Sequence, residues 1–166
     1  MNFTVIEAST VINAISLLAV PTLWRYPSIF FHECGHALAA IAVGSRVRRF
    51  AVGEGEVLWR ARIGGVETLV GLVPSSGMVG IEWVRCSRLK FLFVILAGPA
   101  ANALLAYVAF RLLWATELGV LLFMLLIFEA FTICINLAPR TVSIDGVGYP
   151  SDGLLLLAAF KARKDG

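Results

Sequence analysis

Four long apolar stretches alternate with polar segments along this chain of 166 residues. They cover residues 6–24, 27–43, 91–114 and 118–138. Each is close to the ~20 residues that a helix needs to cross the hydrocarbon core of a bilayer. Only Arg25 and Tyr26 separate the first two, which can form a tight helical hairpin or one interrupted helix. The pattern predicts an α-helical membrane protein with about four transmembrane helices, in a single domain over residues 1–166.

The polar segment between the second and third stretches, residues 44–90, has a different pattern and is rich in Gly and β-branched residues. Apolar and polar positions alternate in three places, 47–52, 56–63 and 66–73. Turn-forming residues lie between and after them, at 53–55, 64–65 and 74–77. Alternation bounded by turn residues predicts a small β-sheet of two to four strands, inserted between the second and third helices.

The composition supports a lipid environment, because 59% of the residues are hydrophobic and only 15% are charged. A soluble domain usually has roughly half apolar and about a quarter charged residues. The net charge of +3 is modest, and no dense Lys/Arg cluster is interleaved with aromatic residues, so we expect no nucleic-acid partner. The odd count of three cysteines argues against a disulfide framework.

The distribution of charge predicts an orientation. Most Lys and Arg residues lie in the insert or behind the last apolar stretch, whereas the other two connections carry only Arg25 and Glu117. Four crossings place the N-terminus, the insert and the C-terminus on one side, and the positive-inside tendency makes that side the cytosol. Because no Lys or Arg precedes Trp24, residues 6–24 are predicted to be a retained helix rather than a signal peptide. The predicted location is the cell (inner) membrane, as a multi-pass protein.

The second apolar stretch contains an HExxH motif formed by His32, Glu33 and His36, the two histidines being the only ones in the chain. On a helix, positions i and i+4 share a face, so both imidazoles can bind one metal ion. Zinc suits such a site, and Glu33 is placed to act on a metal-bound water. Three ionisable groups are costly in an apolar helix unless they have a function there. The motif predicts a metallohydrolase inside a membrane, while a buried polar cluster that holds helices together is the structural alternative.

A catalytic zinc ion has three protein ligands and one open position, so a third ligand must come from elsewhere. Two Asp-Gly pairs follow the last apolar stretch. Asp152 precedes the apolar run 154–160, which predicts a short C-terminal helix over 151–161, and a ligand at a helix start is well held. Asp145 lies among glycines, where a simple turn explains it. We therefore favour Asp152 as the third ligand and keep Asp145 as the alternative.

Several motifs resemble the site-2 protease family of intramembrane zinc metalloproteases, and most closely its small bacterial branch. The matching segments are the HExxH helix, the start of the insert at 43–50, its later strand at 72–79, a GPxxN motif at 98–102, and Asn136-x-x-Pro139 followed by Asp-Gly. The family's usual spacing from proline to aspartate is missed by about one residue at Asp145, and Asp152 lies well beyond it. A longer loop that ends in Ser-Asp-Gly before a helix is what we expect in the smaller branch.

The resemblance implies a role for each of these residues. His32, His36 and Asp152 would bind Zn²⁺, the only cofactor, and Glu33 would transfer the proton of the attacking water. Asn136 would bind the substrate backbone or the developing oxyanion, and a helix C-cap is its structural alternative. Asn102 would support the helix packing around the site, where small residues such as Gly98 let backbones approach closely. Glu129 lies seven residues before Asn136, so it should also point inward, to a polar partner or to a water route.

The predicted function is cleavage of single-pass membrane proteins within or near their membrane span. The substrates that the resemblance suggests are anti-sigma factors or membrane-tethered transcription regulators, and the β-insert would bind an extended segment by main-chain pairing. A non-proteolytic membrane adaptor or chaperone with a structural zinc site is the alternative, although structural zinc does not require Glu33. A metal transporter would need several polar positions along a path, and only one cluster is visible.

Overall fold

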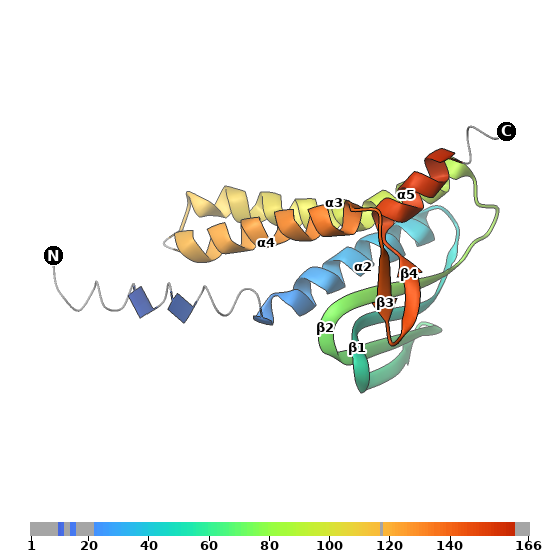
Figure 1. Ribbon diagram of the computed structural model, residues 1–166, viewed down its shortest axis with the longest axis horizontal. Coiled ribbons are helices and arrows are strands. Elements are labelled where there is room, and N and C mark those ends of the chain that lie inside the picture. The colour runs from blue at the N-terminus through green and yellow to red at the C-terminus, as the bar shows by residue number, and fades with distance from the viewer. Residues whose placement is uncertain (1–9, 12–13, 16–21, 117, 162–166) are drawn as a thin grey trace.

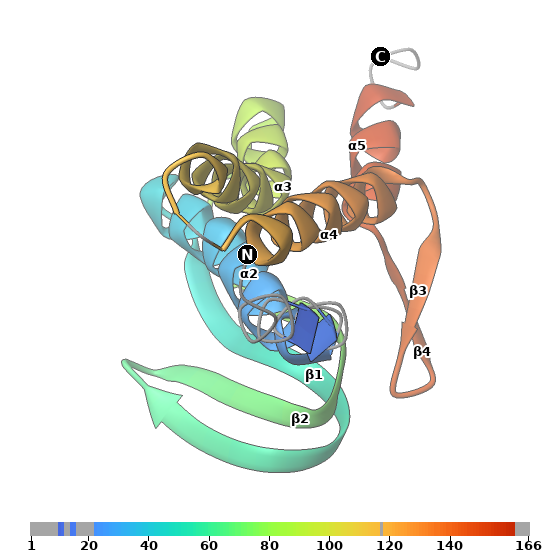
Figure 2. The ribbon, with the colours of Figure 1, turned by 90° about the vertical axis from the view of Figure 1, so that its left-hand side faces the viewer.

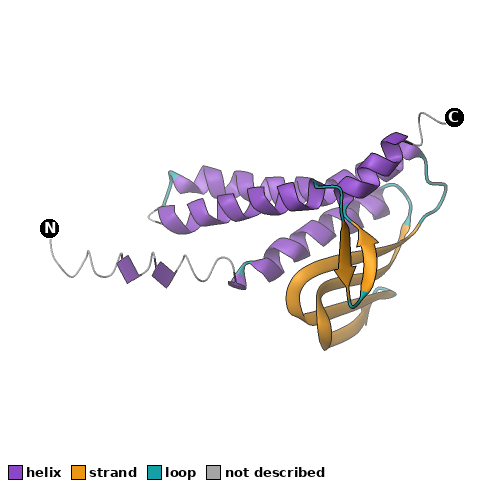
Figure 3. Ribbon diagram, viewed as in Figure 1, coloured by secondary structure: helices purple, strands orange, loops and turns teal. Residues whose placement is uncertain are grey.

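The computed structural model describes residues 10–11, 14–15, 22–116 and 118–161. The predicted first membrane helix, 6–24, therefore lies mostly outside the described residues. The elements are α2 (Arg25–Ala42), β1 (Arg46–Ile63), β2 (Val66–Glu82), α3 (Arg88–Leu113), α4 (Gly119–Leu137), β3 (Thr141–Ile144), β4 (Val147–Pro150) and α5 (Asp152–Lys161). Helices α2, α3 and α4 thus occupy the regions of the second, third and fourth apolar stretches, and the β-insert separates α2 from α3 (Figure 3).

Helices α3 and α4 lie side by side, and α2 packs against α3 (Figure 1). Within the described residues, α3 and α4 are the two helices long and apolar enough to cross a membrane. Both expose large apolar side chains, such as Leu104 and Phe131, which suits contact with lipid. The predicted class, a helical protein with a β-insert and apolar helices fit for a membrane, is confirmed at this level.

The contact between α2 and α3 depends on a residue without a side chain. A Cβ atom at Gly35 would collide with the backbone oxygen of Ala97, so the two helix backbones touch at this point. Close to this contact, Ala39, Ala40 and Val94 form a small buried core, against which the β-insert also packs. Small residues at a helix interface permit such an approach, and here the approach brings α3 beneath the HExxH turn of α2.

The insert is one long hairpin that bends back on itself. Gly64 and Gly65, both with positive φ, form the predicted turn between β1 and β2. The predicted turns at 53–55 and 74–77 are wrong in form, because β1 and β2 run on through them as strands. These regions are bends instead: β1 residues 49–52 pair both with 77–80 and with 67–70 of β2. Figure 2 shows the strong curvature of both strands.

A second hairpin, β3–β4, connects α4 to α5 and was not predicted as strands. Its turn is formed by Asp145 and Gly146, both with positive φ, which is typical of a two-residue hairpin turn. The hairpin extends from the end of α4 towards the β-insert (Figures 1 and 2). There the Asp145 Oδ1 atom accepts a hydrogen bond of 2.9 Å from the backbone N–H of Gly55. The two hairpins are therefore joined at the bend of β1.

Candidate active site

The two histidines lie one turn apart on the buried face of α2. Their Nε2 atoms are 3.1 Å apart, and their ring planes are close to perpendicular, with centroids 4.7 Å apart. Both residues are buried, with 6% and 8% of their surface exposed. The i, i+4 spacing thus places the two imidazoles on one point, as the sequence predicted.

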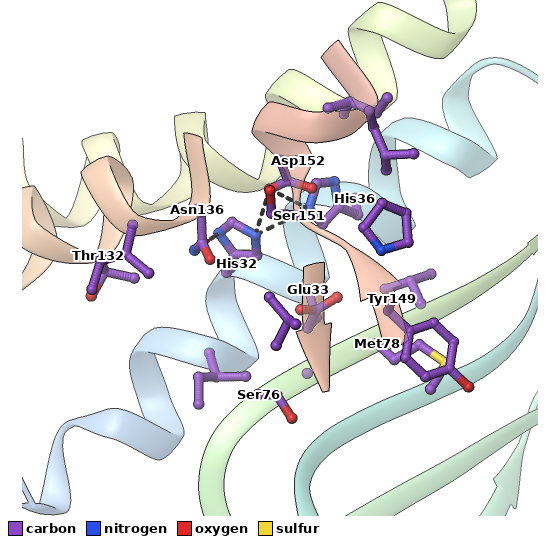
Figure 4. A pocket seen from close by; sticks show the side chains of 18 of the residues that line it. His32, Glu33, His36, Ser76, Met78, Thr132, Asn136, Tyr149, Ser151 and Asp152 are labelled. Atoms are coloured by element: carbon purple, nitrogen blue, oxygen red, sulfur yellow. Dashed lines mark hydrogen bonds and ion pairs between the residues drawn. The ribbon is translucent and has the colours of Figure 1, made fainter. Parts of the chain in front are cut away.

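Asp152 joins this pair from the first turn of α5. Its Oδ2 atom lies 3.1 Å from Nε2 of His32 and 3.4 Å from Nε2 of His36. Among the described residues, these three side chains form the one group that could hold a metal ion, with ligand atoms within 4.8 Å of one another. Asp145 does not join them, because it lies at the tip of the β3–β4 hairpin, where its carboxylate accepts a hydrogen bond from the backbone N–H of Gly55. The structure therefore brings the favoured aspartate, and not the alternative, to the histidines (Figure 4).

The outward nitrogens of both rings are occupied by acceptors. Nδ1 of His36 lies 2.8 Å from the carbonyl oxygen of Val94, and Nδ1 of His32 lies 2.5 Å from Oδ1 of Asn102. An imidazole facing an acceptor at Nδ1 carries its proton there, which leaves the lone pair on Nε2. Two such lone pairs and a carboxylate oxygen repel one another unless a cation lies among them. Ligand atoms ~2.0–2.1 Å from a tetrahedral zinc ion lie about 3.3–3.4 Å apart, so the donor set fits zinc.

Space for an ion beside the histidines depends on Gly98 of α3. A Cβ atom at this position would collide with Nε2 of His36 and would lie 2.8 Å from Nε2 of His32. The imidazoles cannot easily move aside, because Val94 and Asn102 hold them from the other edge. From the sequence, Gly98 was predicted only to serve helix packing. In the structure, Gly98 lies directly against the two Nε2 atoms of the candidate metal site.

Glu33 lies next to the metal group, on the side of β2 (Figure 4). It is 7% exposed, and within the described residues its carboxylate accepts no hydrogen bond. Gly77 of β2 faces it so closely that a Cβ atom there would lie 2.6 Å from Oε1 of Glu33. Because Gly77 has no side chain, β2 can approach closely and still leave room for the Glu33 carboxylate beside the histidines. A carboxylate without a protein partner, at the edge of a cavity, is suited to exchange protons with water.

The backbone around Asp152 is held by Ser151. The Ser151 hydroxyl donates to the carbonyl oxygen of Ala138 at 2.7 Å, and accepts from the backbone N–H groups of Arg140 and Leu154. It therefore caps α5 and joins the helix start to the end of α4. This explains why the Ser-Asp-Gly sequence, and not the loop before it, delivers the carboxylate to the site.

The start of α5 packs closely against the end of α4, and this packing helps to hold Asp152 in place as a charged carboxylate. A Cβ atom at Gly153 would collide with the backbone oxygen of Leu137, so α5 begins in contact with the end of α4. Burial raises the pKa of the Asp152 carboxyl, but the adjacent imidazoles of His32 and His36 outweigh it and lower the pKa to about 2. At neutral pH the group is a carboxylate, the form that binds metal.

A cavity of about 790 Å³ opens over the three ligands. Helices α2, α3 and α4 form part of its wall, and the rest is contributed by β2, the β3–β4 hairpin and α5; its apolar lining includes Ile29, Val79, Phe128, Phe131, Ile135 and Leu155. Asn136 also lines the cavity, with Nδ2 3.4 Å from Nδ1 of His32. Since that Nδ1 already has Asn102 as its acceptor, the Asn136 amide can turn to a ligand in the cavity. Its predicted role towards substrate stays a prediction.

A buried polar network lies behind His32. The sequence predicted a supporting role for Asn102 and an inward direction for Glu129, whereas the parts of Ser28 and Trp24 in the network were not predicted. Asn102 does more than support packing, because its Oδ1 bonds His32 directly. Glu129 accepts hydrogen bonds from Trp24, Ser28 and Asn102. The seven-residue spacing from Asn136 indicated that Glu129 points inward, but which side chains it meets depends on how three helices pack.

Comparison with known proteins agrees with these features. Residues 26–158 match the model of the family described as "Peptidase family M50". Over 109 residues, the chain is 33% identical to a Chlamydia pneumoniae protein named "Putative zinc metalloprotease", a match that covers 52% of this chain and 18% of that protein. It is 32% identical over 106 residues to zinc metalloprotease Rip1 of Mycobacterium tuberculosis, covering 52% and 26%. It is 35% identical over 100 residues to the regulator of sigma E protease of Haemophilus influenzae, covering 50% and 22%.

The chain thus spans about a fifth to a quarter of the length of these relatives. The family match covers most of this chain and includes α2, the β-insert, α3, α4 and the start of α5. The predicted resemblance is confirmed: this chain belongs to peptidase family M50, the family of the site-2 proteases.

Proposed function

We propose that this protein is an intramembrane zinc metalloprotease that hydrolyses peptide bonds of membrane-spanning proteins. The observation that carries the proposal is the meeting of His32, His36 and Asp152 beside the unbonded carboxylate of Glu33, at the floor of a large cavity. A structural zinc site in an adaptor would need neither the free carboxylate nor the open space above it. Two of the relatives carry the words zinc metalloprotease in their names, which supports the same function.

In this proposal, His32 and His36 would hold the zinc ion through Nε2, and Asp152 would be its third ligand through Oδ2. Zinc held there would polarise a water molecule and lower its pKa towards neutrality. Glu33 would take a proton from the attacking water and would then pass it to the leaving amine of the cleaved peptide bond. Asn136 donates its amide N–H to the substrate carbonyl, where negative charge develops.

The substrate must reach the site in an extended form, because a helix hides its peptide bonds in hydrogen bonds. The cavity lies between β2 and the β3–β4 hairpin, and it is open and mostly apolar in its lining. Both features suit an unwound apolar segment. One relative is named as a regulator of sigma E protease, which supports single-pass substrates such as anti-sigma factors or membrane-tethered transcription regulators.

We further propose the location inferred from the charge pattern. The protein is a multi-pass protein of the cell (inner) membrane, with four crossings, and the β-insert lies on the cytosolic side. The two apolar helices α3 and α4 support two of these crossings. Helix α2 is shorter, with 18 residues, and its polar site faces the interior of the fold, so we assign it a crossing that neighbouring helices shield from lipid.

Removal of the metal tests the proposed function. The purified full chain is reconstituted in lipid vesicles with a single-pass substrate, and cleavage is followed by gel electrophoresis. We expect a zinc chelator to stop cleavage and added Zn²⁺ to restore it, because the three ligands alone cannot polarise the attacking water. Magnesium, which prefers oxygen ligands, serves as the control ion and should not restore cleavage. Cleavage that continues after all zinc has been removed would contradict the proposal.

The assignment of the third ligand has its own test. We expect Asp152→Asn to weaken zinc binding by more than the ~10–100-fold that changes outside the ligand set cost, since the amide oxygen is a neutral and weaker ligand. Asp145→Asn is the matched control. It keeps the Oδ1 acceptor for Gly55 and should bind zinc like the unchanged protein. Zinc content after dialysis measures both. The opposite order of effects would assign the site to Asp145.

A further inference from the structure

Glu129 is the largest fully buried side chain of the described residues and lies in the apolar helix α4, with 1% of its surface exposed. The proposed chemistry does not use it. Three donors nevertheless surround its carboxylate: Trp24 Nε1 at 2.6 Å from Oε1, and Ser28 Oγ at 3.0 Å and Asn102 Nδ2 at 2.6 Å from Oε2. A carboxylate in an apolar helix is costly to bury, so this complete set of donors requires an explanation.

Asn102 links Glu129 to His32, one of the three candidate metal ligands. The Asn102 Nδ2 group donates to Glu129 and also to the Ser28 hydroxyl, at 3.1 Å. Its two N–H bonds are thus directed away from α2's histidines, and its Oδ1 atom faces Nδ1 of His32 at 2.5 Å. A reversed amide would place an oxygen against the Glu129 carboxylate and an NH₂ group against the imidazole. The carboxylate therefore decides which way the Asn102 amide lies.

The orientation of this amide fixes the protonation of His32. Because Oδ1 is only an acceptor, His32 must carry its proton on Nδ1 and present the lone pair of Nε2 to the metal. With a reversed amide, Nδ1 would be the acceptor, Nε2 would hold the proton, and the ring could not bind an ion. We propose that Glu129 is a positioning residue which acts through Asn102 to hold His32 in its metal-binding tautomer.

The competing explanation is that these polar groups only join α2, α3 and α4, which pack together here (Figure 2). In that case, loss of Glu129 lowers the stability of the protein but not its intrinsic affinity for zinc. Trp24 distinguishes the two explanations. Its side chain bonds the other carboxylate oxygen, Oε1, and within the described residues makes no hydrogen bond to Ser28, Asn102 or His32.

The experiment measures zinc affinity in the purified full chain in detergent, by competition with a fluorescent chelator. Glu129→Gln offers one acceptor oxygen and one NH₂ group in place of two acceptors, so a donor faces either Trp24 or Asn102. We expect zinc to bind about 10–100-fold more weakly, the effect typical of residues that orient a metal ligand. Trp24→Phe is the matched control and should retain the affinity of the unchanged protein. Thermal unfolding without zinc is recorded for each variant.

Asn102 provides the second comparison, because Glu129 is proposed to affect zinc affinity only through the Asn102 amide. Asn102→Ala should itself weaken zinc binding, and adding Glu129→Gln to it should cause no further loss. A further loss of the same size in this background, or an unchanged affinity in Glu129→Gln with a lowered melting temperature, would overturn the positioning role. If Glu129→Gln does not fold, Ser28→Ala replaces it in both backgrounds, with the same expectation and a smaller effect.

This inference rests on the proposed zinc site, and the two can fail separately. An unchanged protein that binds no zinc overturns both the proposed function and the role of Glu129. Zinc binding and cleavage by the unchanged protein, with full affinity in Glu129→Gln, overturn only the role of Glu129.

Discussion

Glu33→Gln is expected to lower the rate of substrate cleavage by about 10²–10⁴-fold, the usual contribution of a general acid–base group, while zinc remains bound. Glutamine has nearly the same size but cannot take the proton of the attacking water. Since the described residues donate no hydrogen bond to the Glu33 carboxylate, little else should change in the fold. Cleavage in lipid vesicles and zinc content of the same preparation are the two measurements.

The control for this variant is Glu56→Gln, which removes the same charge from an exposed position on β1. It should cleave at the unchanged rate. A Glu33→Gln protein that holds zinc and still cleaves normally would remove Glu33 from the mechanism and leave the metal site without an assigned base. Loss of zinc together with activity would instead give Glu33 a role in holding the metal.

Gly98→Ala should have an equally large effect for a steric reason. The added methyl group would collide with Nε2 of His36 and crowd Nε2 of His32, the two nitrogen atoms proposed to bind the ion. We expect zinc binding and cleavage both to be lost, although alanine favours a helix more than glycine by about 1 kcal/mol. Zinc content, cleavage and helicity by circular dichroism test this expectation together.

Gly119→Ala on α4 is the matched control, because a Cβ atom there meets nothing within 4 Å. It should retain zinc and activity. If Gly98→Ala binds zinc as tightly as the unchanged protein, the ion does not lie between the two Nε2 atoms and the proposed ligand geometry is wrong. A Gly98→Ala protein that lacks helical structure would place the effect in folding instead of the site.

The elements that could be predicted are those with a local signal. Apolar stretches of the right length marked α2, α3 and α4, and the four-residue spacing of the histidines put both on one helix face. Asp152 was favoured over Asp145 for a local reason too, since Ser-Asp-Gly before an apolar run is typical of a helix start. The structure shows the same local chemistry, with Ser151 capping α5.

What could not be predicted depends on residues distant in the sequence. The glycines at 53–55 indicate conformational freedom, but only the pairing of 49–52 with two parts of β2 decides that the chain bends there. Gly98 looks like any small residue of a helix interface until α2 is packed above it. Likewise, the inward direction of Glu129 followed from helix spacing, whereas its bonds to Trp24, Ser28 and Asn102 require the packed bundle.

The order of the ligands along the chain has a consequence for biosynthesis. His32 and Asp152 are 120 positions apart, and the carboxylate arrives on the last described helix. As the polypeptide emerges from the ribosome, the histidines are in place long before their third partner is made. A nascent molecule therefore carries an incomplete candidate metal site until Asp152 has been translated and α5 has packed against the end of α4.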